Sequence, residues 1–443
     1  MEMLKSRAIP CLLGVLLASC SVRGLEAGVA SIDITPPLGI PLQGYPESGR
    51  VAKGVRDPLY ARVLVLRTGS QSMALVDLDL IAPLEPDYIK QLRKAVRPDV
   101  SYVLVAAIHT HSGPPLIPTL SPAPREWESS VTTTIAHAIH QAATQAVPVR
   151  LGVGYGVANI GHNRLRRNRY GGVTWFEKNW TGTSTSPIDS TVGVIRLDDM
   201  TGNPVAILVN YACHPVIFGP DSSLYSADFP GVMTRIVENA MDRKVLCFFL
   251  QGGDGDINPL YAVTPLSEGA VELSERTGAE LGRVALGVAQ QIQAVANSVV
   301  SSLQFAEDTL RFGPRWDAQK WLAADPRSAA TISAKTAPEY DLPVSTVLIN
   351  KQIALVGMPG EPFVNFQTQW RARCPVRDCF FLGYANAYYG YFPTIEAATL
   401  GGYGAAQQST WIEVGAGERM LDYAVVRVYE LLGRINAVPE DLR

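Results

Sequence analysis

The stretch YVLVAAIHTHSGP, residues 102–114, joins an apolar run of strand-forming residues to two histidines separated by one residue. The apolar part, residues 102–108, predicts a buried strand. Side chains two positions apart on an extended segment point the same way, so the imidazoles of His109 and His111 can reach one centre. Such a pair supplies two zinc ligands, or one ligand and one acid–base group, or simply satisfies hydrogen bonds, and the spacing does not choose among these. The chain has six histidines, and two of them follow this one strand.

The same order of an apolar strand followed by a polar residue recurs further along the chain. Polar residues follow the candidate strands 204–212, 244–250 and 346–356, and these residues are His214, Asp254, Asp256 and Glu361. In open α/β sheets, ligands bind beyond the carboxyl ends of the strands. We therefore expect these loops to meet at one rim and to form a zinc site there.

Short β-rich runs alternate with helical stretches along the chain, which predicts an α/β fold. The other candidate strands are 60–67, 73–79, 150–156, 191–197 and 379–383, and the candidate helices are 127–146, 229–241, 267–296 and 415–435. The stretches 157–190 and 312–344 are irregular and are interpreted as surface insertions. No repeat and no Pro/Ser linker divides the chain, so we expect one large domain over residues 25–443.

The composition is that of a globular protein, with 443 residues, 47% hydrophobic residues and a net charge of −3. This charge argues against a nucleic-acid binder, which normally has a basic excess. Residues 1–20 are typical of an export signal, with Lys5 and Arg7 before an apolar run that is too short to span a bilayer.

The signal ends in Leu-Ala-Ser-Cys at 17–20, which resembles a bacterial lipobox and predicts membrane anchoring through Cys20. The alternative is plain secretion with cleavage near Gly24 or Ala27. Either way the chain is expected to be exported from a bacterium, as a periplasmic or secreted protein or an outer-membrane lipoprotein. Of the remaining cysteines, Cys374 and Cys379 flank a short turn that a disulfide could close.

Two imidazoles and one carboxylate are a known catalytic zinc set that leaves a position for water. His214 supplies a third imidazole, although a buried histidine bonded to the backbone is the alternative interpretation. Glu361 supplies the carboxylate, although it also suits a helix start. The other three histidines are His137 and His140, interpreted as structural or surface residues on a helix, and the unassigned His162.

Several dispersed motifs together resemble the neutral ceramidase family. They are the segment 27–37, the HTHSGP run, the segment from His214 to Asp228, the Gly255-Asp256 turn, the Pro359-Gly360-Glu361 turn and Gly383-Tyr384-Ala385-Asn386. The resemblance runs from about Ala27 to about Tyr403. It implies a fold with mixed β-sheets flanked by helices. It also implies a short member without the C-terminal immunoglobulin-like domain, because the chain ends at Arg443.

The resemblance also implies roles for individual residues. The family binds one zinc ion through two histidines, a glutamate and a tyrosine, which correspond here to His109, His214, Glu361 and Tyr391. His111 corresponds to an acid–base or oxyanion partner and Tyr403 to a tyrosine near the substrate carbonyl. Arg164 is similar to an arginine that contacts substrate, and Gly44 to a glycine whose backbone lines the pocket.

These roles predict a zinc amidohydrolase that cleaves an N-acyl amide of ceramide or a ceramide-like lipid. Asn258 stands where the family typically has serine after its Gly-Asp turn, and it is expected to border the substrate. This departure makes a different amide or ester the first alternative substrate. The second alternative is a non-catalytic surface binding protein that keeps zinc for structure.

Overall fold

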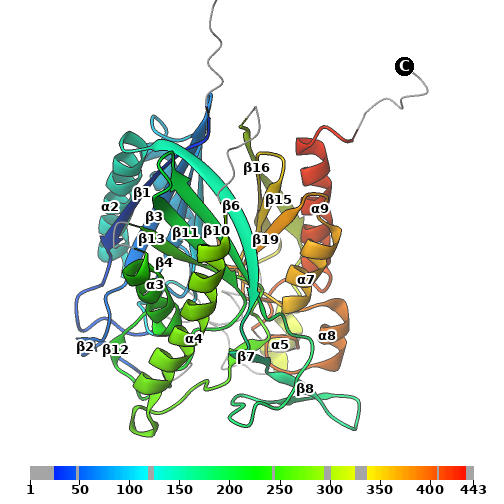
Figure 1. Cartoon of the computed structure of the whole chain (residues 1–443). Coiled ribbons are helices and arrows are strands. Elements are labelled where there is room, and N and C mark those ends of the chain that lie inside the picture. The colour runs from blue at the N-terminus through cyan, green and yellow to red at the C-terminus, as the bar shows by residue number, and fades with distance from the viewer. Residues whose placement is uncertain are drawn as a thin grey trace, which may run out of the picture.

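In the computed structural model, two β-sheets lie face to face and helices cover the outer surface of each (Figure 1). The structure describes residues 24–45, 49–117, 124–241, 245–293, 301–324, 337–406 and 409–435. The expected α/β fold with mixed sheets is therefore confirmed. The layers run helix, sheet, sheet, helix from left to right in Figure 1.

The larger sheet has eight strands in the order β13-β11-β10-β6-β1-β3-β4-β5. Their bounds are β1 Glu26–Asp33, β3 Tyr60–Thr68, β4 Gln71–Leu78, β5 Tyr102–Ala107, β6 Val147–Val157, β10 Thr191–Asp199, β11 Pro204–Tyr211 and β13 Leu246–Gln251. The β11–β13 and β4–β5 pairs are parallel, and the other neighbours are antiparallel. The sheet is therefore mixed, and its two parallel pairs place β11 and β13, and β4 and β5, with their carboxyl ends together.

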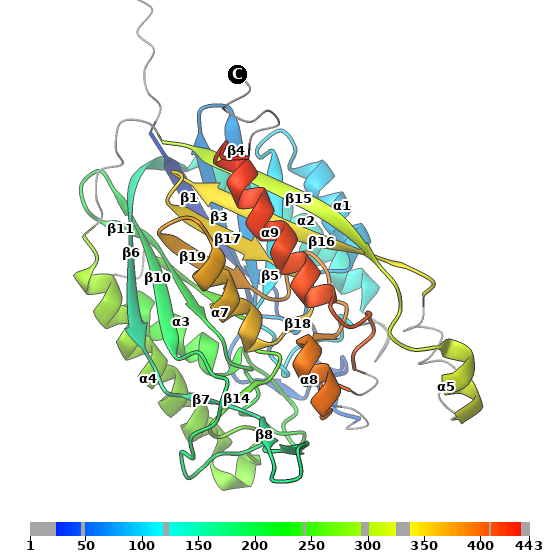
Figure 2. The ribbon, with the colours of Figure 1, turned by 90° about the vertical axis from the view of Figure 1, so that its right-hand side faces the viewer.

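The smaller sheet has four strands in the order β15-β16-β17-β19. Their bounds are β15 Leu303–Phe312, β16 Tyr340–Ile349, β17 Ile353–Gly357 and β19 Asp378–Leu382. Only β17 and β19 run parallel. Figure 2 shows α7 (Val364–Arg373) and α9 (Ala416–Leu431) lying over the outer face of this sheet.

Four longer helices cover the outer face of the eight-stranded sheet: α1 Pro86–Ala95, α2 Arg125–Thr144, α3 Asp228–Ala240 and α4 Ala270–Gln291. Two short helices, α5 Ala318–Ala324 and α8 Ile395–Leu400, lie outside these layers (Figure 2). None of the described helices is long and apolar enough to cross a membrane.

The strands are apolar on both faces because both faces are covered. In β3, Val63 and Val65 join the core under the helices, whereas Leu64 and Leu66 face the second sheet. The same alternation places Leu104 of β5 in the apolar seam between the sheets. This is why the strands are continuous apolar runs in the sequence instead of alternating polar and apolar residues.

The structure corrects two sequence predictions and adds two long strands that were not predicted. The candidate strand 346–356 is a hairpin, in which β16 and β17 are joined by a turn with positive φ at Asn350 and Lys351. The stretch 157–190 is not only a surface insertion, because it contains the buried strand β7 (Gly161–Asn163), which pairs with β14 (Ile257–Pro259). The strands β1 and β15 were not predicted.

Within the described residues, Cys213, Cys247, Cys374 and Cys379 are all free thiols, so the disulfide considered for the 374–379 turn is not formed. Cys213 and Cys247 are buried in the core. Cys20 and the rest of the export signal lie outside the described residues, and lipid anchoring stays a prediction.

Glu128 in the first turns of α2 provides a test of the packing between α2 and the loop before α1. Its side chain is fully buried and its Oε1 accepts a hydrogen bond from the Glu85 backbone N–H at 2.7 Å. Burial raises the pKa of this carboxyl from 4.5 to about 7. Ionisation of Glu128 therefore destabilises the folded state progressively as the pH rises from about 4.5 to about 7.

Glu128→Gln keeps the acceptor oxygen and removes the ionisation. We expect it to raise the free energy of unfolding at pH 8 by on the order of 2 kcal/mol, and to have little effect at pH 4.5 or below. Denaturant unfolding at both pH values measures this difference. Glu126→Gln, at an exposed position of the same helix, serves as the control, and an equal gain from it would refute the argument.

Candidate active site

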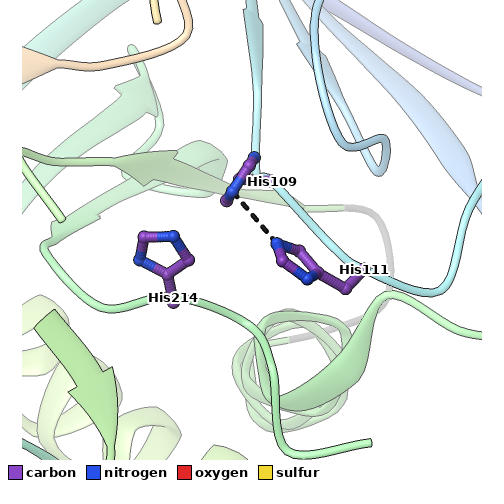
Figure 3. A group of neighbouring side chains, drawn as sticks. All are labelled: His109, His111 and His214. Carbon is purple, nitrogen blue, oxygen red and sulfur yellow. Dashed lines mark hydrogen bonds between the residues drawn. The ribbon is translucent and has the colours of Figure 1, made fainter. Parts of the chain in front are cut away.

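Three imidazoles lie together beyond the carboxyl ends of β5 and β11 (Figure 3). His109 and His111 come from the loop after β5 and His214 from the loop after β11, and one ring nitrogen of each lies within 4.8 Å of the others. The Nε2 atoms of His109 and His111 are 3.2 Å apart. The predicted convergence of the pair is confirmed, but its cause differs. β5 ends at Ala107 and His109 has a φ of 71°, so the two rings meet across a turned backbone.

His109 and His214 are each oriented by a backbone carbonyl that binds the far side of the ring. His109 Nδ1 donates to Ile81 O at 2.6 Å, and His214 Nδ1 donates to Asp254 O at 2.7 Å. Both Nε2 atoms therefore carry a free lone pair that faces the shared centre. Histidines that bind metal ions are held in this way, because the bond at one nitrogen fixes the tautomer and the direction of the other.

Glu361 supplies a carboxylate to the same centre from the second sheet. Its Oε2 lies 3.1 Å from His214 Nε2 and 3.5 Å from His109 Nε2. The residue begins β18 (Glu361–Pro362), which follows β17 and pairs with β20 (Tyr391–Phe392). Gly360 makes this turn possible, because its φ is 84° and a Cβ there would lie 2.3 Å from the Gly390 carbonyl oxygen.

Burial and the neighbouring charges set the protonation states of these groups. Burial by itself would raise the pKa of the Glu361 carboxyl, but His109 and His214 outweigh it, so that this pKa falls to about 2. Burial, helped by Arg164, lowers the pKa of His214 to about 3. Burial also lowers the pKa of His109. Neutral imidazoles beside an ionised carboxylate are the protonation states that metal binding requires.

The geometry of these donors fits a divalent metal ion. Zinc bonds of 2.0–2.1 Å in a tetrahedral site place neighbouring ligand atoms about 3.3 Å apart. The separations from Glu361 Oε2 to the two Nε2 atoms, 3.1 and 3.5 Å, lie on either side of this value. His111 Nε2, at 3.2 Å from His109 Nε2, lies within the same range. His109 and His214 together with either Glu361 or His111 could hold such an ion.

Arg164, directly after β7, brings a positive charge to the aromatic side of the site. Its guanidinium donates to Asn258 Oδ1 at 3.0 Å, to the Gly255 carbonyl at 2.7 Å and to the Tyr391 hydroxyl at 3.1 Å. Its Cζ also lies 5.2 to 5.5 Å from the ring centroids of three aromatic residues, namely Trp175, Tyr391 and Tyr403. The side chain is buried and three hydrogen bonds from its two terminal nitrogens hold it, so its charge has a fixed position.

Asn258 of β14 has both ends of its amide engaged. Besides accepting from Arg164, it donates from Nδ2 to the Glu177 carbonyl at 3.1 Å, and it is 1% exposed. A buried amide with these two partners holds Arg164 in place. The described contacts of Asn258 are thus with Arg164 and with the Glu177 backbone.

Comparison with known proteins shows to which family the chain belongs. The family described as neutral/alkaline non-lysosomal ceramidase, N-terminal, matches residues 25–271, which is more than half of the chain. The chain belongs to this family. Its fold is also similar to the crystal structure of neutral ceramidase from Pseudomonas aeruginosa, with a TM-score of 0.75 at 20% identity over 95% of this chain and 77% of that one. A second structure, a ceramidase complexed with C2, has a TM-score of 0.72 at 20% identity over 94% of this chain and 76% of that one.

In this ceramidase-family chain, the backbone of Gly44 packs against the imidazole of His111, and only glycine leaves room for that ring. Gly44 has a φ of 114°, and a Cβ there would lie 2.4 Å from His111 Cγ. The backbone of Gly44 therefore lies directly against the imidazole. His111 is half-buried, and its Nδ1 has no hydrogen-bond partner among the described residues. Burial, followed by His109 and His214, lowers the pKa of His111 well below its ordinary value.

Two tyrosines support the site without having been predicted to do so. Tyr384 stacks on His109 with ring centroids 4.1 Å apart and donates to Asp254 Oδ1 at 2.7 Å. Tyr388 donates its hydroxyl proton to Glu361 Oε1. The sequence signal was the density of tyrosines at 384–403, and this density does not distinguish residues that pack from residues that position a ligand.

The remaining histidines lie away from the centre. His137 and His140 are exposed on α2, and His140 contacts Asp99. The interpretation of both as structural or surface residues agrees with this placement. His162 Nε2 bonds the Phe176 carbonyl at 2.8 Å, which makes it a buried residue of β7.

Proposed function

We propose that this protein is a zinc-dependent hydrolase that cleaves the N-acyl amide of ceramide or a ceramide-like lipid. The observation that carries the proposal is that the Nε2 atoms of His214 and His109 lie 3.1 and 3.5 Å from one carboxylate oxygen, Glu361 Oε2. Membership of the ceramidase family supports the amide substrate. The similar structures of a neutral ceramidase and of a ceramidase complexed with C2 support a lipid substrate.

In this proposal one zinc ion is held by His109, His214 and Glu361, with Tyr391 as the fourth ligand. The β18–β20 pairing sets Tyr391 directly opposite Glu361, which supports this role. Zinc acts as a Lewis acid, which polarises a carbonyl and makes water acidic enough to attack it near neutral pH.

His111 is the proposed proton carrier. Its ring lies beside His109, and its Nδ1 is free of hydrogen bonds among the described residues. A neutral imidazole in this position takes a proton from the attacking water and gives it to the leaving amine, as general acid–base catalysis requires. The backbone of Gly44 supports the ring and borders the substrate.

Arg164 and Tyr403 are proposed to face the carbonyl oxygen as it gains negative charge. Fixed donors of this kind stabilise the charge without having to reorient. The hydrogen bonds of Arg164 to Asn258 and Gly255 hold the guanidinium before substrate arrives. Asn258 then acts on the substrate through Arg164.

A second candidate is a zinc hydrolase of a different amide or an ester. The observation that favours it is Asn258, since the family typically has serine there and the Asn258 amide shapes the position of Arg164. A panel of N-acyl amides and esters, assayed with the purified protein, separates the two. Faster hydrolysis of ceramides than of all other substrates supports the main proposal, and preference for an ester or a small amide supports the alternative.

His214→Ala tests the metal site. Losing one of the proposed ligands weakens metal binding sharply, so the variant is expected to lose both zinc and hydrolysis. Elemental analysis after zinc loading and dialysis measures the metal. His137→Ala, which removes an exposed imidazole on α2, is the matched control and should retain about one zinc per chain. Equal zinc content in the two variants would refute the assignment.

Comparing His109→Ala with His111→Ala separates a ligand from a proton carrier. His109→Ala is expected to lose zinc and activity together. His111→Ala is expected to keep its zinc but to lose turnover by roughly 10²-fold or more. If both variants lost their zinc to the same extent, His111 would be a ligand, as the proximity of the three imidazoles also allows.

Asn258→Ser tests the position behind Arg164. A serine hydroxyl is too short to reach both Arg164 and the Glu177 carbonyl, and we expect the bond from the buried Arg164 guanidinium to be the one lost. Such bonds contribute about 1.5–3 kcal/mol, and we expect kcat/KM to fall by about tenfold or more while zinc content stays unchanged. Kinetics on the best substrate of the panel measure this. Unchanged kcat/KM would show that Asn258 does not position Arg164.

A further inference from the structure

A hairpin of two short strands projects from the molecule next to the proposed active site. It is formed by β8 (Leu165–Arg167) and β9 (Val173–Trp175), and both views show it at the lower edge of the molecule, beyond β7 (Figures 1 and 2). It begins directly after Arg164. The hairpin therefore follows a residue of the site directly in the chain.

The two faces of the hairpin differ. Leu165 and Val173 lie against Gly402, where a Cβ would come within 2.6 Å of Val173 Cγ2, and the Trp175 ring lies 5.3 Å from the Tyr403 ring. Because side chains alternate along a strand, Arg166 and Thr174 lie on the opposite face, and both are exposed. One face thus contacts the site but leaves Arg167 and Trp175 exposed, and the other faces solvent.

The charge of this region is opposite to that of the whole chain. The segment 165–182 carries Arg166, Arg167, Arg169 and Lys178 against a single acid, Glu177, so its net charge is +3 in a chain of net charge −3. The three arginines are exposed. Among the described residues, none of these arginines forms an ion pair with a carboxylate. Arg166 and Arg169 lie instead over the rings of Phe176 and Tyr170.

Large aromatic residues are exposed in the same segment. Tyr170, at the tip, is 81% exposed, and Trp180 and Trp175 are 51% and 42% exposed. Arg169 covers the Tyr170 ring at 4.9 Å and donates to its hydroxyl at 2.6 Å. Tryptophan and tyrosine prefer the level of lipid headgroups, where one end of the ring is apolar and the other is hydrated.

We propose that the β8–β9 hairpin and the following residues to 182 dock on an anionic lipid surface. Basic residues are attracted to such a surface, and exposed aromatic residues insert at its headgroups. A nucleic acid would also attract arginines, but the exposed Trp and Tyr beside a site for an acyl substrate favour lipid. Docking through this hairpin, which contacts Tyr403, would bring the proposed site close to the membrane, where a lipid substrate resides. The choice of a lipid surface rests in part on the proposed function, whereas the binding itself does not require hydrolysis.

Co-sedimentation of the purified protein with vesicles tests this. We expect binding to vesicles of phosphatidylglycerol and phosphatidylcholine, weak binding to phosphatidylcholine alone, and weaker binding at higher salt. The variant Arg166→Ala/Arg169→Ala/Tyr170→Ala should bind the anionic vesicles at least tenfold more weakly, since each basic residue near the surface contributes roughly fivefold. Arg97→Ala/Arg125→Ala/Tyr423→Ala, which removes two arginines and one tyrosine exposed elsewhere, is the matched control and should bind as the wild type does.

Hydrolysis provides a separate readout. The hairpin variant should cleave a water-soluble short-chain N-acyl substrate at the wild-type rate and a vesicle-embedded one more slowly. Equal vesicle binding by the hairpin variant and the control would overturn the proposal. Binding to a short DNA duplex, lost in the hairpin variant, without binding to vesicles would overturn the choice of lipid. Vesicle binding that depends on the hairpin, in a protein that hydrolyses no amide, would refute the proposed function and leave the docking surface standing.

Discussion

The site depends on a buried hydrogen-bond network around Asn386. This network joins β5, the edge strand of the eight-stranded sheet, to the loop after β19 of the four-stranded sheet. Asn386 binds the β5 backbone twice, through its side-chain oxygen to Val105 N and through its own N–H to Val105 O, both at 2.8 Å. Its amide nitrogen donates to Glu307 and Ser345, which belong to β15 and β16. A buried side-chain amide whose oxygen and nitrogen are both hydrogen-bonded is stable in one arrangement only. This fixes the loop after β19 against β5, and so helps to hold Tyr384 on His109, which follows that strand.

The same hydrogen-bond network explains why strained backbone occurs at this site. His109, Tyr384 and Asn386 have φ values of 71°, 50° and 59°, in the left-handed region that side chains other than glycine rarely adopt. Such residues cost free energy and persist where the surroundings determine them fully. Here the hydrogen bonds of Asn386, the stacking of Tyr384 on His109 and the bond from His109 to Ile81 provide that determination. The imidazole is thus held in position before any ligand binds.

The sequence predicted the parts of the site that follow from strand ends, because buried strands are long apolar runs and the polar residue after each is easily seen. His109, His214 and Glu361 were found in this way, and the structure brings them together. The turn at Asn350 was missed because Asn-Lys lacks the glycine that usually marks a tight hairpin. The burial of Arg164 was missed because it arises from pairing between β7 and β14, which are distant in sequence and only three residues long. Tyr388 was missed because contact with Glu361 depends on tertiary packing alone.

The origin of the donors has a consequence for stability. His109 and His214 come from the loops after β5 and β11 of the eight-stranded sheet, whereas Glu361 begins β18, just after β17 of the four-stranded sheet. The seam between the sheets is otherwise apolar, with residues such as Leu64, Leu208 and Leu355, and burial of this kind does not select one register of the two sheets over a close alternative. The proposed zinc ion would bond to both sheets at one end of the seam, and the Asn386 network fixes them at the edge. Because an ion that binds only the folded state stabilises it, zinc would stabilise the packing of the two sheets as well as supply the chemistry.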